Sequence, residues 1–277
     1  MISREKVLEA NIKLHTHLAN TYKSDEPHYS KENVLRVEKN IKNLQKRTNG
    51  NNLLDVGCGM GFIIDIAKKY FRNIQGIDIT QAMLDKIDTR HAKGKIEVQI
   101  AEIEKMPFAH NSFDICTAYA VIHHLHTLKP AFKDIYRVLR PGGVFYTDTD
   151  PNYYFWAAFK GLKDSEKYSD FVRREIYAIQ HKDDEMEKKF NVPKNVLLNA
   201  EVLKHVEGGF KAEVINSLLV EIGFSDVEIH YEWFLGEAKI IHSKKDSLSV
   251  DALRRHLTEM LPLSRHLFKY ISIIATK

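Results

Sequence analysis

The stretch LLDVGCGMGF at residues 53–62 restricts the possible folds more than any other part of the sequence. Its opening apolar residues predict a short buried strand, with Asp55 near the strand's end. Gly57, Gly59 and Gly61 follow at alternate positions, where residues without a Cβ let the backbone turn sharply and approach a ligand. Apolar residues then recur at helical spacing, so we expect a helix whose N-terminus faces that ligand. A strand, a glycine turn and a helix in this order are typical of nucleotide-like ligand sites in open α/β sheets.

The spacing of the glycines excludes two common nucleotide-binding motifs. A dinucleotide fingerprint has glycines at its first, third and sixth positions, and the sixth position counted from Gly57 is Phe62. A phosphate-binding P-loop ends in Gly-Lys followed by Ser or Thr, which residues 53–62 lack. The loop therefore predicts a nucleotide-like ligand that neither of these motifs binds.

Short apolar strands alternate with amphipathic helices from residue 53 onward. This alternation predicts an open α/β fold with a parallel sheet and helices on both faces. We expect Thr80 to cap the helix after the second strand, and residues 140–143 (Arg-Pro-Gly-Gly) to stop the helix before the fifth. Strands are predicted at residues 53–56, 74–79, 96–100, 113–119, 144–148, 227–231 and 270–275.

The segments outside this alternation read as helical additions. Residues 1–50 predict two amphipathic helices that form an N-terminal cap, the first with Val7, Leu8, Ile12, Leu14 and Leu18 on its apolar face. Residues 51–277 are expected to form one α/β domain, which a chain of 277 residues can accommodate. Two insertions, at 151–209 and 235–268, are expected on the substrate side of that domain.

Composition narrows the function classes. The net charge is only +4 and basic residues are interspersed with acidic ones, so nothing predicts a nucleic-acid partner. The two cysteines, Cys58 and Cys116, do not suggest a disulfide framework, which favours a reducing, cytoplasmic location. The N-terminus has no apolar signal segment, and no apolar run is long enough to predict a transmembrane span.

Five motifs in order over residues 53–148 resemble those of the class I S-adenosylmethionine (SAM) methyltransferases, of the small-molecule type similar to the ubiquinone- and menaquinone-biosynthesis group. They are the glycine loop with Asp55, the acidic residue Asp78 after the second strand, Ala101-Glu102-Ile103 after the third, residues 106–114 before the fourth, and residues 137–143 after the next helix. The resemblance implies a doubly wound, mostly parallel seven-stranded Rossmann-like sheet. It also implies SAM as methyl donor, S-adenosyl-L-homocysteine as product, and a small-molecule acceptor.

The cofactor site expected from these motifs combines the loop with the strand ends. Asp78 is placed to accept hydrogen bonds from the ribose hydroxyls, as an acidic residue does in dinucleotide folds. Glu102 is a longer substitute for the aspartate that is commoner at its position in the family. Simpler interpretations are that Asp55 only caps the turn and that Cys58 only fills space. The expected set is Asp55, Gly57, Cys58, Gly59, Asp78, Ile79, Met83, Glu102, Ile103 and Tyr119.

Catalytic candidates follow the fourth strand. His124, and second to it His123, can serve as a general base for an oxygen or carbon acceptor, because an imidazole of ordinary pKa (about 6.5) removes protons near neutrality. The alternative is that these histidines only fix their loop. Tyr22, from the N-terminal cap, can close the pocket. We expect no metal at His123, His124 and His126, because adjacent histidines do not easily face one ion and no Cys or carboxylate completes a tetrahedral set. His15 is expected to be a polar residue of the surface or of the cap.

The acceptor itself is the least determined part. The aromatic run at 153–156 suggests an acceptor with apolar or planar character, and the alternative is that this run only attaches the insertion to the sheet. The sequence does not choose between oxygen, nitrogen and carbon as the methylated atom, and it leaves the oligomeric state open. Two other functions remain: different chemistry at a SAM site, or a non-catalytic role in a biosynthetic complex.

Overall fold

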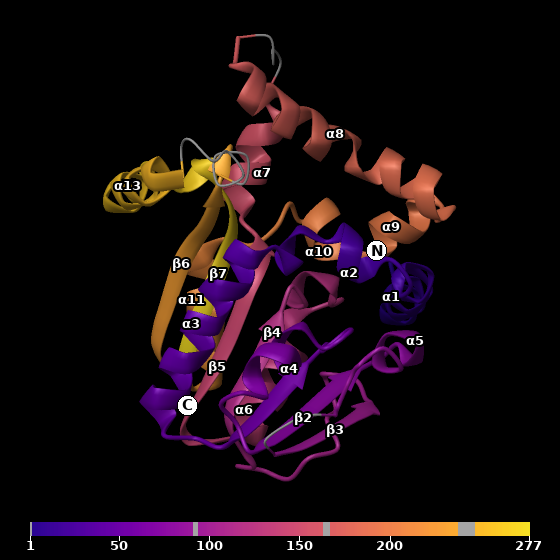
Figure 1. Ribbon diagram of the computed structural model, residues 1–277, viewed down its shortest axis with the longest axis vertical. Helices are drawn as coiled ribbons and strands as arrows, with labels where there is room; N and C mark the ends of the chain where they lie inside the picture. The colour runs from indigo at the N-terminus through magenta and orange to yellow at the C-terminus, as the bar shows by residue number, and fades with distance from the viewer. Residues whose placement is uncertain (1, 91–93, 163–166, 238–246) are drawn as a thin grey trace.

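The computed structural model describes residues 2–90, 94–162, 167–237 and 247–277. These residues contain one seven-stranded sheet with helices around it (Figure 1). Its strands are β1 (Asn52–Val56), β2 (Asn73–Asp78), β3 (Lys95–Ile100), β4 (Phe113–Tyr119), β5 (Leu139–Pro151), β6 (Ser225–Phe234) and β7 (Phe268–Thr276). They are arranged in the order β3-β2-β1-β4-β5-β7-β6. All pairs are parallel except those of β7, which is antiparallel to β5 and β6. The predicted doubly wound, mostly parallel sheet is confirmed.

The strand order reverses between β1 and β4, which are neighbours in the sheet although β2 and β3 lie between them in the sequence. The chain therefore leaves the carboxyl ends of β1 and β4 in opposite directions. A crevice forms at such a point, and it is where open α/β sheets bind their ligands. The glycine loop follows β1, so the fold places it in this crevice.

The fifth strand is longer than predicted. Helix α6 (Leu128–Val138) ends as expected, but β5 begins at once with Leu139, which pairs with Phe113, and it continues to Pro151. The helix thus stops before residues 140–143 as predicted, but these residues belong to the strand, which was predicted to begin only at residue 144. A shift in register between Phe113 and Ile115 takes up the extra residues as an irregularity of the strand pair, which is how a sheet accommodates inserted residues without losing its pairing.

Helices cover both faces of the sheet. α3 (Lys31–Thr48) and α4 (Phe62–Ala67) pack on the face that Leu53 points to, with α3 in front of the sheet in Figure 1. α6 and α11 (Ala212–Ile222) pack on the opposite face, to which Leu54 points. Leu53 and Leu54 face opposite layers because successive side chains of a strand alternate, and both are fully buried. β1 is therefore central to both core clusters.

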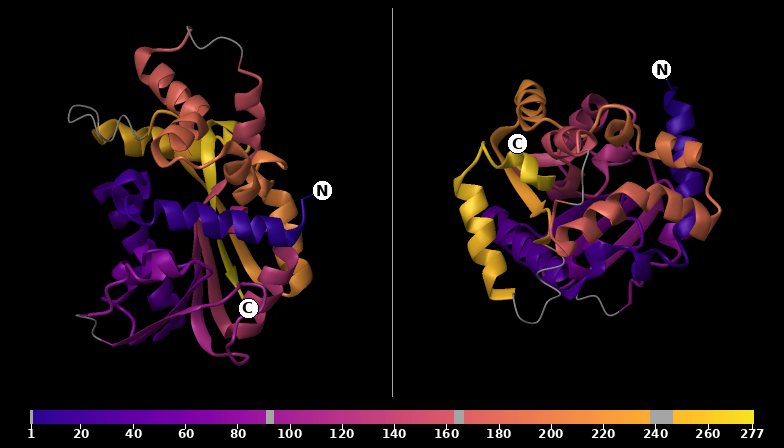
Figure 2. Two further views of the ribbon diagram at one scale, coloured as in Figure 1. Left: turned by 90° about the vertical axis from the view of Figure 1, so that its right-hand side faces the viewer. Right: turned by 90° about the horizontal axis from the view of Figure 1, so that it is seen from above.

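A layer of helices lies over the carboxyl ends of the strands (Figures 1 and 2). The layer contains α1 (Arg4–Leu18), α2 (Tyr22–Asp25), the short 3-10 turn η1 (Pro27–Tyr29), α7 (Tyr153–Lys160), α8 (Asp170–Phe190), α9 (Lys194–Ala200) and α10 (Val202–His205). We call these segments the lid. α1 and α9 pack together through Ala10, Leu14, Val196 and Leu197. Residues 4–29 and the first insertion, far apart in sequence, thus lie over the strand ends as one layer, whereas α3, the other helix of the predicted N-terminal cap, packs on the sheet.

The face that α1 buries differs in part from the predicted one. Val7, Leu14 and Leu18 are buried as expected, but Ile12 is 38% exposed and Asn11 is buried in its place. Asn11 Nδ2 donates to the carbonyl oxygen of Val7 at 2.9 Å and to that of His124 at 3.0 Å. A polar side chain takes this position because it joins the lid to the loop after β4.

The remaining elements are short or lie beside the sheet. α5 (Gln81–Leu84) is a single turn after β2, and Thr80 occupies its N-cap position without making a side-chain cap bond. α13 (Ser247–Glu259) and the 3-10 turn η3 (Arg265–Leu267) precede β7. Among the described residues, no helix is both long and apolar enough to cross a membrane. Part of the predicted second insertion lies outside the described residues.

Candidate active site

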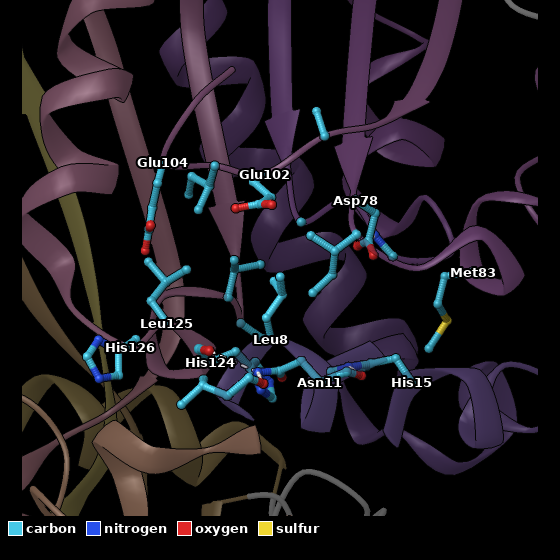
Figure 3. A pocket seen from close by; sticks show the side chains of 18 of the residues that line it. Leu8, Asn11, His15, Asp78, Met83, Glu102, Glu104, His124, Leu125 and His126 are labelled. Atoms are coloured by element: carbon cyan, nitrogen blue, oxygen red, sulfur yellow. Dashed lines mark hydrogen bonds between the residues drawn. The ribbon is translucent and has the colours of Figure 1, made fainter. Parts of the chain in front are cut away.

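One cavity lies between the glycine loop, the ends of β2 and β3, and α1 (Figure 3). We call it the donor cavity. Its empty volume is about 890 Å³ with its open mouth included. Asp78 and Met83 lie on one side, Glu102 and Glu104 on another, and His15 and His124 on a third. Ten of the residues expected from the sequence line it: Tyr22, Gly57, Gly59, Asp78, Ile79, Met83, Glu102, Ile103, Tyr119 and His124.

The glycine loop is shaped by left-handed backbone conformations. Gly57, Gly59 and Gly61 have φ angles of 63°, 51° and 83°, which residues with a Cβ rarely adopt. A Cβ on Gly57 would lie 2.6 Å from Val121, so the loop packs closely against the segment after β4. A Cβ on Gly59 would meet no atom within 4 Å. Gly59 therefore presents bare backbone to the donor cavity.

Asp78 holds the loop in this shape. Its Oδ2 accepts a hydrogen bond from the backbone nitrogen of Gly59 at 2.9 Å, and its Oδ1 accepts one from the nitrogen of Thr80 at 2.8 Å. Each carboxylate oxygen can accept a second hydrogen bond, so the side chain can also bind hydroxyl groups in the cavity. The Thr80 hydroxyl itself is buried without a hydrogen-bond partner.

Asp55 and Cys58 do not line the donor cavity but a small hollow beside the loop, together with Tyr22 and Tyr29. Asp55 is 2% exposed, and its Oδ1 accepts a hydrogen bond from the Thr117 hydroxyl at 2.7 Å. Burial, with a smaller contribution from the negative charge of Asp78, raises the pKa of Asp55 to about 7. Burial also raises the pKa of the Cys58 thiol well above its ordinary value, as expected for a side chain that fills space.

The lid closes one side of the donor cavity through Arg4, a residue that the sequence analysis missed. Its guanidinium forms ion pairs with Glu102 and Glu104 beyond β3. Glu102 was expected to contact the ligand, and its side chain is 43% exposed, so the ion pair with Arg4 does not bury it. Arg4 could not be identified from the sequence because nothing in the local pattern of α1 shows which residues face β3.

A second cavity lies beneath the lid on the other side of Tyr22, Tyr119 and His124. We call it the acceptor cavity; its empty volume is about 1150 Å³ with the mouth included. His15 and Ala120 also line both cavities. His15 was expected only as a polar residue of the surface or of the cap, whereas it lies between the cavities, and its ring packs edge-on against that of His124 with centroids 5.0 Å apart. The two cavities meet at the carboxyl end of β4.

The acceptor cavity is rich in ionisable groups from the lid and from β7. Three lysines line it, and two of them form ion pairs: Lys204 with Glu201, and Lys269 with Glu175. Negative charge on Glu26 holds the pKa of the third, Lys182, above its ordinary value. Trp233 and Tyr270 are aromatic members of the lining. The cavity therefore offers charged and hydrogen-bonding groups in addition to apolar surface.

The aromatic run at 153–156 lines neither cavity. Phe155 is buried and stacks on Phe159 with centroids 5.5 Å apart, and the ring of Tyr154 lies 3.4 Å from the guanidinium carbon of Arg265. α7 packs against η3 and β7. Of the two interpretations of this run, attachment of the insertion to the sheet agrees with the structure.

His123 and His124 lie on η2 (Ile122–His124), directly after β4. Nδ1 of His123 is 2.8 Å from Oδ1 of Asp150, and Nδ1 of His124 is 3.1 Å from the carbonyl oxygen of Ala200. Burial lowers the pKa of His123 to about 3 and that of His124 well below its ordinary value, so both rings are neutral near pH 7. His124 lines both cavities, whereas His123 lines only the acceptor cavity.

Comparisons with known proteins agree with this geometry. A methyltransferase domain family matches residues 54–147, which run from β1 to β5. A probable S-adenosylmethionine-dependent methyltransferase of Mycolicibacterium smegmatis is 30% identical over 42% of this chain and 44% of its own length. A malonyl-[acyl-carrier protein] O-methyltransferase of Serratia marcescens is 32% identical over 36% of this chain and 38% of its own. The matched segment thus spans less than half of either relative.

The fold extends the similarity to almost the whole chain. The crystal structure of the [4+2]-cyclase SpnF superposes with a TM-score of 0.56 at 14% identity, covering 96% of this chain and 94% of that one. At this identity the match concerns the fold alone. The sequence match to the methyltransferase domain lies on the part of the fold that builds the donor cavity. Residues 54–147 thus match a methyltransferase domain family, and the S-adenosylmethionine-dependent methyltransferase of Mesorhizobium loti, whose crystal structure superposes with a TM-score of 0.53 over 86% of this chain and 96% of its own at 15% identity, shares the fold.

Proposed function

We propose that this protein transfers the methyl group of SAM to a small molecule bound beneath the lid. The observation that carries the proposal is the meeting of two cavities at the end of β4, where His15, Tyr22, Tyr119, Ala120 and His124 line both. One cavity adjoins the glycine loop and Asp78, and the other adjoins the ionisable groups of the lid. A donor and an acceptor bound in them would approach each other at these shared residues.

The donor cavity fits the parts of SAM in turn. Asp78 would accept hydrogen bonds from the ribose hydroxyls while it also holds Gly59. Ile79, Met83 and Ile103 supply apolar walls for the adenine, and the bare backbone at Gly59 leaves room for the methionine part. Asp55, in the hollow beside the loop, would attract the positive charges of that part.

The chemistry needs little from the protein beyond alignment. Methyl transfer is an in-line displacement: the acceptor atom forms a bond to the methyl carbon while the carbon–sulfur bond breaks and the sulfonium becomes a neutral thioether. Holding the two reactants in line and excluding water supplies most of the acceleration. The lid excludes water, and Tyr22 and His124 lie where donor and acceptor would meet.

His124 would act as the general base if the acceptor carries a proton to be removed. Its Nδ1 is engaged by the carbonyl of Ala200, which leaves Nε2 for the acceptor. Its lowered pKa keeps the ring neutral and able to accept a proton, but makes it a weak base. The ionisable lining of the acceptor cavity supports an acceptor with polar or charged groups in place of the apolar one expected from residues 153–156.

Labelled methyl transfer tests the proposal. Purified protein would be incubated with methyl-labelled SAM and fractionated metabolites, with detection of both the labelled product and S-adenosyl-L-homocysteine. The expected result is one labelled metabolite class that forms in proportion to S-adenosyl-L-homocysteine and is lost with Asp78→Ala. If a metabolite is consumed but its product carries no label, the result would instead support different chemistry in the same fold. The similarity in fold to a [4+2]-cyclase makes this the second candidate function.

A further inference from the structure

We propose that His123, His124 and Glu201 form a binding site for a divalent transition-metal ion in the acceptor cavity. The two histidines come from η2, and Glu201 lies between α9 and α10 of the lid. One ligand atom from each residue lies within 4.8 Å of the other two. The site as such does not depend on the function proposed above, whereas the role given to it below does.

The separation of the three side chains suits an ion after a small contraction. Nitrogen and oxygen ligands bind zinc at about 2.0–2.2 Å, so that neighbouring ligand atoms of a tetrahedral site are roughly 3.4 Å apart. The atoms of this cluster therefore need to move closer by roughly 1 Å. Glu201 belongs to the lid and the histidines to the sheet domain, so closing of the lid would supply this movement.

The hydrogen bonds around the histidines are those that metal-bound imidazoles make. Nδ1 of His123 is held by Asp150, whose Oδ1 also accepts from the backbone nitrogen of His123 at 3.3 Å. Nδ1 of His124 is held by the carbonyl of Ala200. A carboxylate or a carbonyl on the second ring nitrogen is the usual outer partner of a metal-bound histidine. Both rings are thus left with Nε2 as the nitrogen available to an ion.

Glu201 has one oxygen engaged and one available. Its Oε2 forms an ion pair with Lys204 and lies 3.3 Å from Nε2 of His205. These contacts keep the carboxylate in place and leave Oε1 for an ion. The positive charge of Lys204 beside Glu201 disfavours Mg²⁺ and Ca²⁺, because their binding depends mainly on the negative charge of oxygen ligands. Two imidazoles and one carboxylate instead favour Zn²⁺, Fe²⁺ or Co²⁺.

A purely structural role explains only half of this arrangement. Tethering of the loop needs the Nδ1 contacts of His123 and His124, but it gives no reason for both rings to lie beside Glu201. His126 shows what a tether alone looks like, since its Nε2 is 3.1 Å from the carbonyl oxygen of Ile2 and it is not part of the cluster. No metal was expected from the sequence, because the histidines at 123, 124 and 126 do not form a site by themselves. The third proposed ligand, Glu201, comes from the lid.

Three protein ligands leave at least one position of the ion open toward the acceptor cavity. With the ion bound, Nε2 of His124 is a ligand and no longer a base, so the ion takes over the activation of the acceptor. If the protein is a methyltransferase, an acceptor hydroxyl bound there would have a lowered pKa and would lose its proton to water at the mouth of the cavity. The resulting oxygen would form the new bond to the methyl carbon as the carbon–sulfur bond breaks. The site thus favours an acceptor that is methylated on oxygen.

Metal titration of the full-length protein without an affinity tag tests the site. Protein stripped with a chelator would be titrated with Zn²⁺ by calorimetry and with Co²⁺ by visible absorption. We expect one ion per chain and the d–d absorption bands of Co²⁺ in a site of low coordination number. His124→Ala and Glu201→Gln should each weaken binding at least tenfold. His126→Ala, in the same loop, should leave the affinity unchanged.

Several results would overturn the proposal. One is that folded wild-type protein binds no Zn²⁺ or Co²⁺. Another is that His126→Ala and His124→Ala lose the same affinity for the ion. Glu201→Gln preserves the shape of the side chain, so circular dichroism of that variant separates loss of a ligand from loss of the fold. SAM would be titrated into the same samples. Binding of SAM without metal would reject only this site, and binding of metal without SAM would reject the proposed function.

Discussion

The carboxylate of Asp78 at the end of β2 accepts a hydrogen bond from the backbone nitrogen of Gly59 at 2.9 Å. The residue that would bind the ribose of the donor thus also fixes the loop that would face its methionine part. A single side chain would thus position two ends of one ligand, and the hydrogen bond that fixes the loop is already formed without the ligand. Such preorganisation lowers the ordering cost of binding.

Asp78 should therefore be the side chain most important for donor affinity. Asp78→Ala is expected to weaken SAM binding by about 1–3 kcal/mol, because buried hydroxyls lose their acceptor. Asp85→Ala, an exposed carboxylate on the other side of α5, is the matched control and should change little. Titration calorimetry measures both.

A ligand that lacks a ribose hydroxyl separates the two roles of Asp78. A 2′-deoxy analogue of S-adenosyl-L-homocysteine should bind wild type more weakly than the parent compound, and should bind Asp78→Ala about as well as the parent does. If the analogue loses the same affinity in both proteins, Asp78 acts only through the loop.

Gly59 offers a test of the open backbone. Gly59→Ala and Gly142→Ala each place a Cβ on a left-handed residue, with φ of 51° and 76°, and neither Cβ meets an atom within 4 Å. Both should lose about 1–2 kcal/mol of unfolding free energy from backbone strain. Only Gly59→Ala should also lose SAM affinity, because its methyl group enters the donor cavity. Equal SAM affinity of the two variants would place the donor elsewhere.

The pKa of Asp55 predicts a pH-dependent donor affinity. In the free protein this pKa is about 7, raised by burial and by the charge of Asp78. A positively charged ligand group nearby would lower it, so binding at pH 7 should release roughly half a proton. The affinity for SAM should then rise as the pH increases toward 8 and level off above it. Calorimetry in buffers of different ionisation enthalpy measures the release, which Asp55→Asn should abolish.

Arg36 on α3 should be important for stability. Its guanidinium binds both oxygens of Asp148 at 2.8 and 3.1 Å, and Asp148 is fully buried. Arg36→Ala would leave that carboxylate buried and unpaired, which typically costs about 3–5 kcal/mol. Arg47, on the same helix as Arg36, forms an exposed ion pair with Glu228 of β6. Arg47→Ala breaks this pair and should lower the free energy of unfolding by less than about 1 kcal/mol. Unfolding in urea compares them; equal losses would contradict this account.

The sequence predicted what local patterns determine. The turn made by the loop glycines follows from spacing within one strand–turn–helix unit, and the position of Asp78 follows from the end of the next strand; the structure has both as expected. The strands follow from alternation and from apolar runs. The start of β5 at Leu139 was missed because pairing with Phe113 overrides the turn signal of the Pro-Gly-Gly that follows.

The parts that were missed depend on how the lid meets the sheet. Helical periodicity cannot show what each side of α1 packs against. Leu14 lies in the core of the lid, whereas its neighbour His15 lies between the two cavities. Arg4 likewise forms its ion pairs with residues distant in the sequence, and Glu201 lies beside two histidines distant from it. Their neighbours in the chain give no signal for such contacts, so only the tertiary structure identifies them.

The most direct test of the account is a calorimetric titration of the full-length protein with SAM and with S-adenosyl-L-homocysteine. The account predicts one molecule bound per chain, in the micromolar range, with NAD as a comparison ligand that does not bind. Absence of binding of both adenosyl ligands to protein shown to be folded by circular dichroism would contradict the assignment of the donor cavity.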